Sequence, residues 1–259
     1  MPKQHLRTID VARAVNVHPN TVRLYEEWGH LPPIPRGPNG YRLFTADHVD
    51  QMRLARTALQ WPYPGGKDPV IRLVKSAAHR EFGQSMESAY HFLSNVRAEQ
   101  AHADAAAAFL ERWASGQASD TTPRPLHIGA AASRLGVTTD MLRNWERSGL
   151  LHVPRHPRNG YRLYAAADMG RARIIRVLRQ AGYSVMAILR MLLAFDTAPR
   201  EGLLRSGASL RQLLDTPRPD EDVYHVTDRW LSTLAEVEQR VLDVIQLLEA
   251  MIKKDQLRR

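Results

Sequence analysis

Apolar residues in the first part of the chain recur at helical spacing and are interrupted by turn residues. The spacing predicts a short helix through Ile9, Val11, Ala12 and Val15. Residues 19–29 predict a second helix, because this segment opens with proline and closes with glycine. Four prolines in 31–40 and the alternating residues of 41–44 then predict a small hairpin, or wing. The predicted order is helix, turn, helix and wing.

Longer helices are predicted after the wing. Apolar spacing indicates helices over 45–59 and 70–78, separated by a proline- and glycine-rich interruption at 61–66. A long helix is predicted from residue 85, with apolar or small residues three and four apart at Met86, Ala89, Leu93, Val96, Ala103, Ala107 and Leu110. This stripe predicts a seam against another helix. Small polar residues and prolines at 116–125 predict a linker, because they disfavour packing.

The rest of the chain repeats this plan. Helices are predicted over 128–135, 138–148, 165–180 and 184–194, with a second wing at 154–164. After a looser stretch at 196–222, a last long helix carries apolar residues at four-three spacing, namely Trp230, Leu234, Val237, Val241, Val244, Leu248 and Met251. Each half is therefore expected to end in a heptad helix of similar length.

A constant offset of 120 residues relates the two halves. The pentapeptide Asn-Gly-Tyr-Arg-Leu occurs at Asn39–Leu43 and at Asn159–Leu163, and further identities recur at this offset between 12–63 and 132–183. The repeat preserves Arg, Glu and Gly positions, so it keeps surface chemistry and turn geometry as well as a core. We predict a tandem duplication with a domain at 1–80, a long helix at 85–115, a linker at 116–125, a domain at 126–195, and a loop with a second long helix at 196–259.

Composition narrows the class of function. The formal charge is +9 and the pI is near 10.1, which favours a polyanionic partner such as nucleic acid. The sequence has no cysteine, which excludes disulfides, thiolate metal sites and a cysteine nucleophile. No apolar run of membrane-spanning length and no apolar N-terminal stretch is present, so we expect a cytoplasmic, nucleoid-associated protein.

Two segments, Thr21–Leu31 and Met141–Leu151, share a pattern in which Arg, an aromatic residue and Glu precede Gly and Leu, and a basic wing with Gly-Tyr-Arg follows each. On these residues the chain resembles the MerR family of bacterial transcription regulators over 6–80 and 126–195. The resemblance implies a mainly α fold with two winged helix-turn-helix domains, each followed by a long dimerisation helix, and operators bound as two half-sites.

The second helix of each half is predicted to enter a major groove with its N-terminal side chains at base edges. The DNA-binding candidates on these helices are His18, Asn20, Thr21, Thr138, Thr139, Asp140 and Asn144. Arg23 and Arg143 are candidates for phosphate, because a guanidinium offers five donors on a planar head. Pairing of these arginines with Glu26 or Glu146 is the structural alternative.

The wings add basic and aromatic side chains on the same side. The predicted phosphate contacts are Arg36, Tyr41, Arg42, Arg155, Arg158, Tyr161 and Arg162. The two tyrosines have packing within the wing as their structural alternative. Arginines on solvated loops often have no function, but the same placement in both copies favours contact with DNA.

The two halves differ at two informative positions. Tyr25 has a hydroxyl that can donate to phosphate, while Trp145 at the equivalent position offers a differently placed indole N–H. Asp140 brings a negative charge where the first half has Asn20. These differences predict an operator whose half-sites are unequal.

The sequence predicts neither a metal nor a cofactor. Metal-sensing members of the family rely on thiolates near the end of the dimerisation helix, so the resemblance to them stops at the DNA-binding part. The eleven histidines form no convincing ligand set. The sequence does not identify a small-molecule effector. A pocket between the long helices or ordinary core packing would account for Phe92, Phe109, Trp113, Tyr224 and Trp230.

The long helices are predicted to pair within the chain as an antiparallel coiled coil, 85–114 against 226–254. Alanines at 103, 106, 107 and 108 allow close approach, and each helix alone would expose an apolar stripe. This pairing would make a monomeric pseudo-dimer. The alternative is a homodimer with four DNA-binding domains.

The predicted function is sequence-specific transcription regulation on double-stranded DNA. The resemblance implies that the protein binds a promoter operator, distorts it, and acts with RNA polymerase. An architectural or recombination-accessory protein, like the excisionases that share the winged fold, is the alternative. No paired carboxylates, nucleophile with base, or phosphate-cradling glycine loop stands out, so we expect no enzyme activity.

Overall fold

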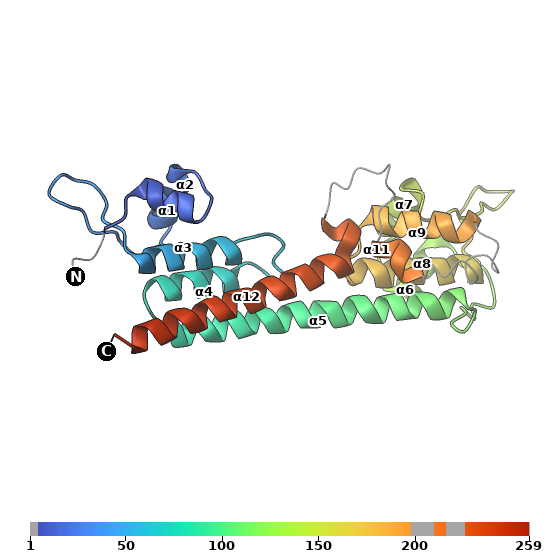
Figure 1. Cartoon of the computed structure of the whole chain (residues 1–259). Coiled ribbons are helices and arrows are strands. Elements are labelled where there is room, and N and C mark those ends of the chain that lie inside the picture. The colour runs from blue at the N-terminus through green and yellow to red at the C-terminus, as the bar shows by residue number, and fades with distance from the viewer. Residues whose placement is uncertain (1–4, 198–209, 216–225, 259) are drawn as a thin grey trace. The chain divides into compact units, whose positions relative to one another are not determined.

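A computed structural model of the chain describes residues 5–197, 210–215 and 226–258 (Figure 1). It divides into two compact units, one of residues 1–98 with 235–259 and one of residues 99–234. The described part is mainly helical, as predicted, and its non-helical backbone pairs only through isolated bridges. Among the helices of this part, none combines the length and the hydrophobicity that crossing a membrane requires.

The first unit opens with the predicted helix, turn and helix. Its helices are α1 (Thr8–Ala14), α2 (Pro19–Glu27), α3 (Ala46–Ala58), α4 (Asp68–Ala78), the beginning of α5 (Phe82–Ala114) and the end of α12 (Trp230–Gln256). Proline at the first position starts α2, and Gly29, with φ of 72°, takes the left-handed conformation that ends it. The predicted wing is held by bridges Leu6↔Phe44 and Arg36↔Arg42 rather than by full strands.

Two apolar clusters hold the first unit together. One joins α1, α2, α3 and the wing through fully buried residues that include Val11, Val22 and Phe44. The other joins α3 and α4 to both long helices, and Leu54 and Val74 belong to it. Burying a side chain of this size contributes roughly 1.5–3 kcal/mol, so the two clusters fix the recognition helix on its support.

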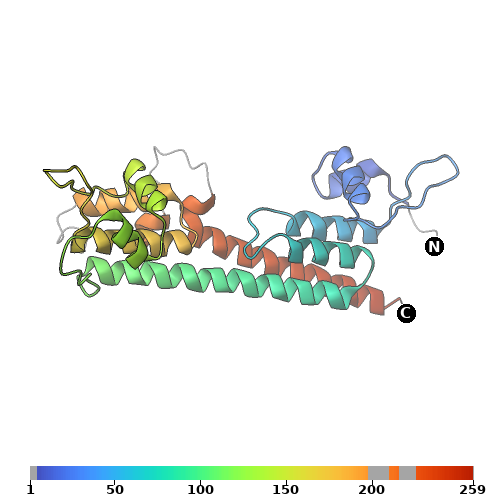
Figure 2. The same ribbon diagram turned by 180° about the vertical axis from the view of Figure 1, so that it is seen from behind.

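The long helices lie side by side and antiparallel in the first unit (Figure 1 and Figure 2). Leu93 and Val96 of α5 share a buried cluster with Val241 and Leu248 of α12. Two ion pairs agree with this direction. Arg97 of α5 pairs with Glu238, early in α12, and Arg80, just before α5, pairs with Asp255, late in α12. Helix pairing within one chain is therefore present in this unit. A coiled coil along the full length of both helices stays a prediction.

The second unit repeats the arrangement of the first. It holds the end of α5, then α6 (Ile128–Leu135), α7 (Thr139–Arg147), α8 (Ala166–Gln180), α9 (Val185–Thr197), α11 (Leu210–Asp215), a 3-10 turn (Val226–Arg229) and the start of α12. Bridges Leu126↔Tyr164 and Arg155↔Arg162 hold its wing. The predicted loose stretch at 196–222 contains α11, and residues 198–209 and 216–222 within it lie outside the described residues.

Most residues of the predicted linker 116–125 are exposed, but one of its side chains is buried in the second unit. Asp120 has a fully buried side chain, and Arg173 of α8 donates to its Oδ2 at 2.6 Å. The backbone N–H of Thr122 donates to Asp120 Oδ1 at 2.9 Å. Burial raises the pKa of Asp120, but its hydrogen bonds from Thr122 and the charge of Arg173 outweigh this effect and lower the pKa. A buried, paired carboxylate therefore anchors this segment to the second unit.

Candidate nucleic-acid interface

Helix α2 exposes polar side chains at its N-terminal end. His18 caps the helix, because its Nδ1 accepts a hydrogen bond from the backbone N–H of Asn20 at 3.2 Å. The side chains of Asn20 and Arg23 are exposed, and Arg23 Nη1 donates to Asn20 Oδ1 at 3.2 Å. An amide and a guanidinium on one exposed helix face suit base edges and phosphate respectively.

Helix α7 presents the equivalent face in the second unit. Thr138 caps it, and its Oγ1 accepts from the backbone N–H three residues later at 3.1 Å. Arg143 Nη1 donates to Asp140 Oδ1 at 2.7 Å, and Arg147 donates to Asn144 Oδ1. Asp140, Arg143 and Asn144 are all exposed. Among the predicted reading positions of the two halves, His18, Asn20, Thr138, Asp140 and Asn144 are therefore exposed.

The glutamate of each recognition helix pairs with the wing, not with the arginine on its own helix. Glu26 Oε2 accepts from Arg42 Nε at 2.5 Å, and Glu26 Oε1 accepts from the backbone N–H of Ile34 at 3.2 Å. Glu146 and Arg162 form the same pair in the second unit. The four side chains are between 16% and 25% exposed. Arg42 and Arg162 therefore tie the wing to the recognition helix, and the recognition-helix arginines are left for other partners.

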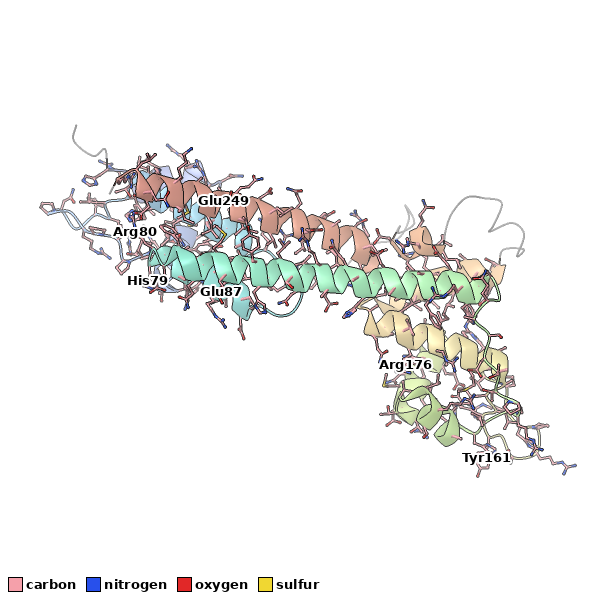
Figure 3. The ribbon with its side chains drawn as sticks, turned by 90° about the horizontal axis from the view of Figure 1, so that it is seen from below. His79, Arg80, Glu87, Tyr161, Arg176 and Glu249 are labelled. Atoms are coloured by element: carbon pink, nitrogen blue, oxygen red, sulfur yellow. The ribbon has the colours of Figure 1, made fainter. Side chains whose placement is uncertain are left out.

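The remaining wing residues project into solvent. Arg36 and Arg155 each donate to a wing carbonyl oxygen, at 3.2 Å and 3.3 Å. Tyr41 is 71% exposed and Tyr161 is 64% exposed, so neither ring is buried in its wing. Tyr161 lies at the outer part of the second wing (Figure 3), and Arg158 is also exposed. These side chains are accessible to a DNA backbone.

A cleft in the second unit brings the recognition helix and the wing together. It has a volume of about 650 Å³, and Arg143, Arg155 and Tyr161 line it. His127 also lines the cleft, and its ring meets Tyr161 edge-on at 6.1 Å between centroids. Sequence reasoning missed His127. The repeat offset carried a signal for it, because Arg7 gives the first half a basic residue at the equivalent position.

Trp145 differs from its prediction. Its side chain is only 6% exposed and belongs to the apolar core of the second unit. This burial corrects the prediction of a surface role, because the ring is packed in the core. The equivalent Tyr25 is half-buried, and burial raises the pKa of its hydroxyl, with the charge of Arg56 acting in the opposite direction. Thr21 and Thr139 are half-buried in the first turns of their helices.

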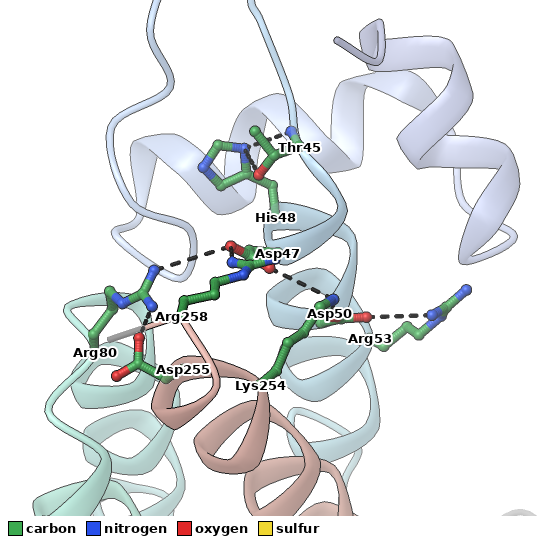
Figure 4. Close-up of polar contacts among 9 residues, drawn as sticks. All are labelled: Thr45, Asp47, His48, Asp50, Arg53, Arg80, Lys254, Asp255 and Arg258. Atoms are coloured by element: carbon green, nitrogen blue, oxygen red, sulfur yellow. Dashed lines mark hydrogen bonds and ion pairs between the residues drawn. The ribbon is translucent and has the colours of Figure 1, made fainter. Parts of the chain in front are cut away.

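A charged cluster in the first unit holds the end of α12 against α3, the helix that follows the wing. Its members are Asp47, Asp50, Arg80, Lys254, Asp255 and Arg258 (Figure 4). Lys254 Nζ lies 2.7 Å from Asp50 Oδ2, and Arg258 pairs with Asp47. Burial raises the pKa of Asp47, but its bonds from Arg258 and Lys254 outweigh this and lower the pKa. The last turn of α12 is thus clamped to α3, beside a cavity of about 330 Å³.

The aromatic side chains considered for an effector pocket belong to different parts of the chain. Phe92 lies in the core of the first unit, while Phe109, Trp113 and Trp230 pack in the core of the second. Trp230 Nε1 donates to the backbone oxygen of Ala181 at 2.9 Å, and Tyr224 lies outside the described residues. The described residues include no group of three His, Asp or Glu side chains placed to hold a metal ion.

Known proteins match both halves of the chain. Residues 126–194 match the family described as "MerR HTH family regulatory protein", and residues 7–44 match that described as "MerR family regulatory protein". The chain is 30% identical to the HTH-type transcriptional regulator HmrR of Rhizobium leguminosarum bv. viciae over 97 residues, which is 38% of this chain and 70% of that protein. No solved structure gives a significant match.

Two further relatives carry names that refer to metals. A mercuric resistance operon regulatory protein of Bacillus cereus is 26% identical over 129 residues, or 49% of this chain and 97% of that protein. A probable heavy metal-dependent transcriptional regulator of Haemophilus influenzae is 32% identical over 75 residues, which is 29% of this chain and 59% of that protein. With its helix-turn-helix geometry present in both units and these matches on both halves, the chain belongs to the MerR family of regulatory proteins.

Proposed function

We propose that this protein is a sequence-specific DNA-binding regulator of transcription that binds two unequal half-sites of a promoter operator. One observation carries the proposal. Both recognition helices hold an exposed arginine bonded to an exposed polar side chain at the same place, Arg23 with Asn20 and Arg143 with Asp140. The net charge of +9 adds attraction for phosphate that does not depend on sequence.

Phosphate contacts and base contacts fall to different residues in this proposal. Arg23 and Arg143, together with the exposed wing residues, hold the phosphate backbone and set the register of each domain on the duplex. The exposed side chains at the start of each recognition helix read the bases in the major groove. Arg42 and Arg162 act indirectly, since their bonds to Glu26 and Glu146 position the wings.

The single chain supplies both DNA-binding domains of one operator complex. Support comes from the first unit, where α5 and α12 of the same chain bury apolar faces against each other and leave less surface for a second chain. A homodimer with four DNA-binding domains is the alternative arrangement.

Regulation acts through the shape of the promoter. The protein distorts the DNA between its half-sites so that RNA polymerase can meet both promoter elements. Deformation of this kind costs on the order of a few to 10 kcal/mol, which phosphate contacts offset. Some relatives are named for metals, but this protein has no metal effector bound through thiolates, because the sequence contains no cysteine.

The test is to select genomic fragments that bind the purified full chain and to map the protected bases. We expect two unequal protected half-sites within promoter spacers. Replacing both Arg23 and Arg143 with alanine should weaken binding to all selected fragments, while Arg112→Ala, an exposed arginine on α5, should not. Binding without sequence preference contradicts the proposal. Protected sites away from promoters favour an architectural protein, and doubled sites that need two chains favour the homodimer.

A further inference from the structure

The two recognition helices carry different side chains at equivalent exposed positions. The repeat offset pairs Asn20 with Asp140 and Leu24 with Asn144, and all four side chains are exposed. The classes of burial agree residue by residue along the two helices, from 18–28 and 138–148, apart from positions 21/141, 25/145 and 28/148. The helices therefore present different chemistry from the same places on one scaffold.

The shared arginines give the variable side chains a similar orientation. Asn20 Oδ1 accepts from Arg23 Nη1 at 3.2 Å, and Asp140 Oδ1 accepts from Arg143 Nη1 at 2.7 Å. Each side chain is thus turned along its helix towards the same neighbour. The two side chains differ in the hydrogen-bonding groups that remain for another partner. The Asn20 amide retains two N–H donors, whereas the Asp140 carboxylate retains only acceptor lone pairs.

The leftover groups select different base edges in a major groove. Asparagine can donate to N7 and accept from N6 of adenine, whereas a carboxylate accepts from the N4 amino group of cytosine. Residues four apart lie on one face of a helix, so position 24 or 144 meets a base close to the one that faces position 20 or 140. Leu24 suits the methyl group of thymine, and Asn144 suits a second adenine.

We propose that Asn20 and Asp140 are the residues that make the half-sites unequal. Asn20 selects an A·T pair by its adenine edge, and Asp140 selects a G·C pair at the equivalent position by its cytosine edge. The inference rests on the proposed function, because it assigns the base specificity of the same two helices.

A purely structural role for the Asp140–Arg143 pair explains less. The pair spans one helical turn, its side chains are 78% and 49% exposed, and an ion pair in that setting contributes little to stability. A carboxylate facing DNA also repels phosphate unless a base amino group or a nearby cation offsets its charge. Arg143 offsets that charge on one side, and Asp140 keeps its second oxygen for a cytosine amino group.

The experiment is selection from a random duplex pool by the full chain and by the exchanged variants Asn20→Asp and Asp140→Asn. Each variant should change one base pair in one half-site only, from A·T to G·C for Asn20→Asp and from G·C to A·T for Asp140→Asn. Each should lose roughly tenfold or more in affinity for the wild-type site, the size of one well-made base contact.

Controls separate the two levels of the proposal. Glu87→Gln on α5 (Figure 3) removes one negative charge from an exposed residue, as Asp140→Asn does, and should leave both half-sites unchanged. Unchanged thermal unfolding verifies that both variants fold. If wild-type protein selects unequal half-sites and neither exchange alters them, the assignment to Asn20 and Asp140 is wrong while the proposed function stands. If wild-type protein selects no sequence, both fail.

Discussion

The Glu26–Arg42 ion pair, which joins the recognition helix to the wing, should determine how rigidly the wing is held. Replacing Glu26 with glutamine tests this. One carboxylate of Glu26 bonds both sides of the wing, accepting from Arg42 Nε at 2.5 Å on the returning side and from the Ile34 N–H at 3.2 Å on the outgoing side. Glutamine keeps the shape of the side chain but removes the charge that attracts Arg42.

The structure sets the size of the effect. A hydrogen bond to a charged group contributes about 1.5–3 kcal/mol, and the Glu26 and Arg42 side chains are 16% and 22% exposed. Partial solvent screening and the remaining amide oxygen of glutamine reduce this to about 1–2 kcal/mol of local stability. Because 1.4 kcal/mol is a factor of ten, the wing amides should exchange hydrogen roughly 5 to 30 times faster.

Hydrogen exchange of the peptide 33–43, followed by mass spectrometry, measures this directly. Glu27→Gln is the matched control, because the neighbouring glutamate is exposed and has the same change in charge. Glu146→Gln should loosen the second wing at least as much, since Arg155 also lies 3.7 Å from Glu146. Unchanged exchange in the first wing of the Glu26→Gln protein would refute the argument.

Three further substitutions have defined outcomes. Burial first, and nearby lysines second, lower the pKa of the His30 side chain in the folded protein. As the pH falls, His30 is therefore protonated in the unfolded chain before it is protonated in the folded protein, and stability is lost below about pH 6.5. His30→Leu, which copies the buried Leu150 of the second unit, should remove that loss in thermal unfolding between pH 7 and 5, and an unchanged pH slope would contradict it. The pKa of Asp47 is lowered, so its bond with Arg258 stabilises the protein above the ordinary carboxyl pKa of about 4 and is lost as the pH falls further. Asp47→Asn should therefore cost on the order of 1 kcal/mol at pH 7 and flatten the acid limb of the stability curve, whereas an unaltered acid limb would count against the pairing. Trp145→Phe should lower the unfolding temperature but leave DNA affinity unchanged in the folded protein, and lost affinity without lost stability would restore a surface role for Trp145.

Helical periodicity and capping residues predicted most of the fold. Helix α6 (Ile128–Leu135) has the predicted bounds, because apolar spacing fixes its buried face and Gly136, with φ of 64°, ends it. The six-residue helix α11 was not predicted, since so short a segment shows no clear period. The wings were predicted as hairpins from turn residues, but their backbones make only isolated bridges.

Ion pairs between segments far apart in the chain could not be predicted from the sequence. Composition marks 116–125 as a linker because its residues are polar, and it gives no sign that Asp120 meets Arg173 in a later helix. In the same way, helical spacing suggested Arg23 as the partner of Glu26, but in the structure Arg42 of the wing pairs with Glu26. The exposed reading positions were predictable because their place at the start of a helix follows from local signals alone.

The proposal that one chain binds both half-sites is best tested by mapping protected bases on one selected genomic fragment. The proteins to compare are the wild-type chain and the single variants Arg23→Ala and Arg143→Ala. One chain should protect two half-sites. Arg23→Ala should weaken protection of one of them, and Arg143→Ala should weaken protection of the other. Equal loss at both half-sites from either variant would contradict the proposal, because each domain would then not be reading its own half of the operator.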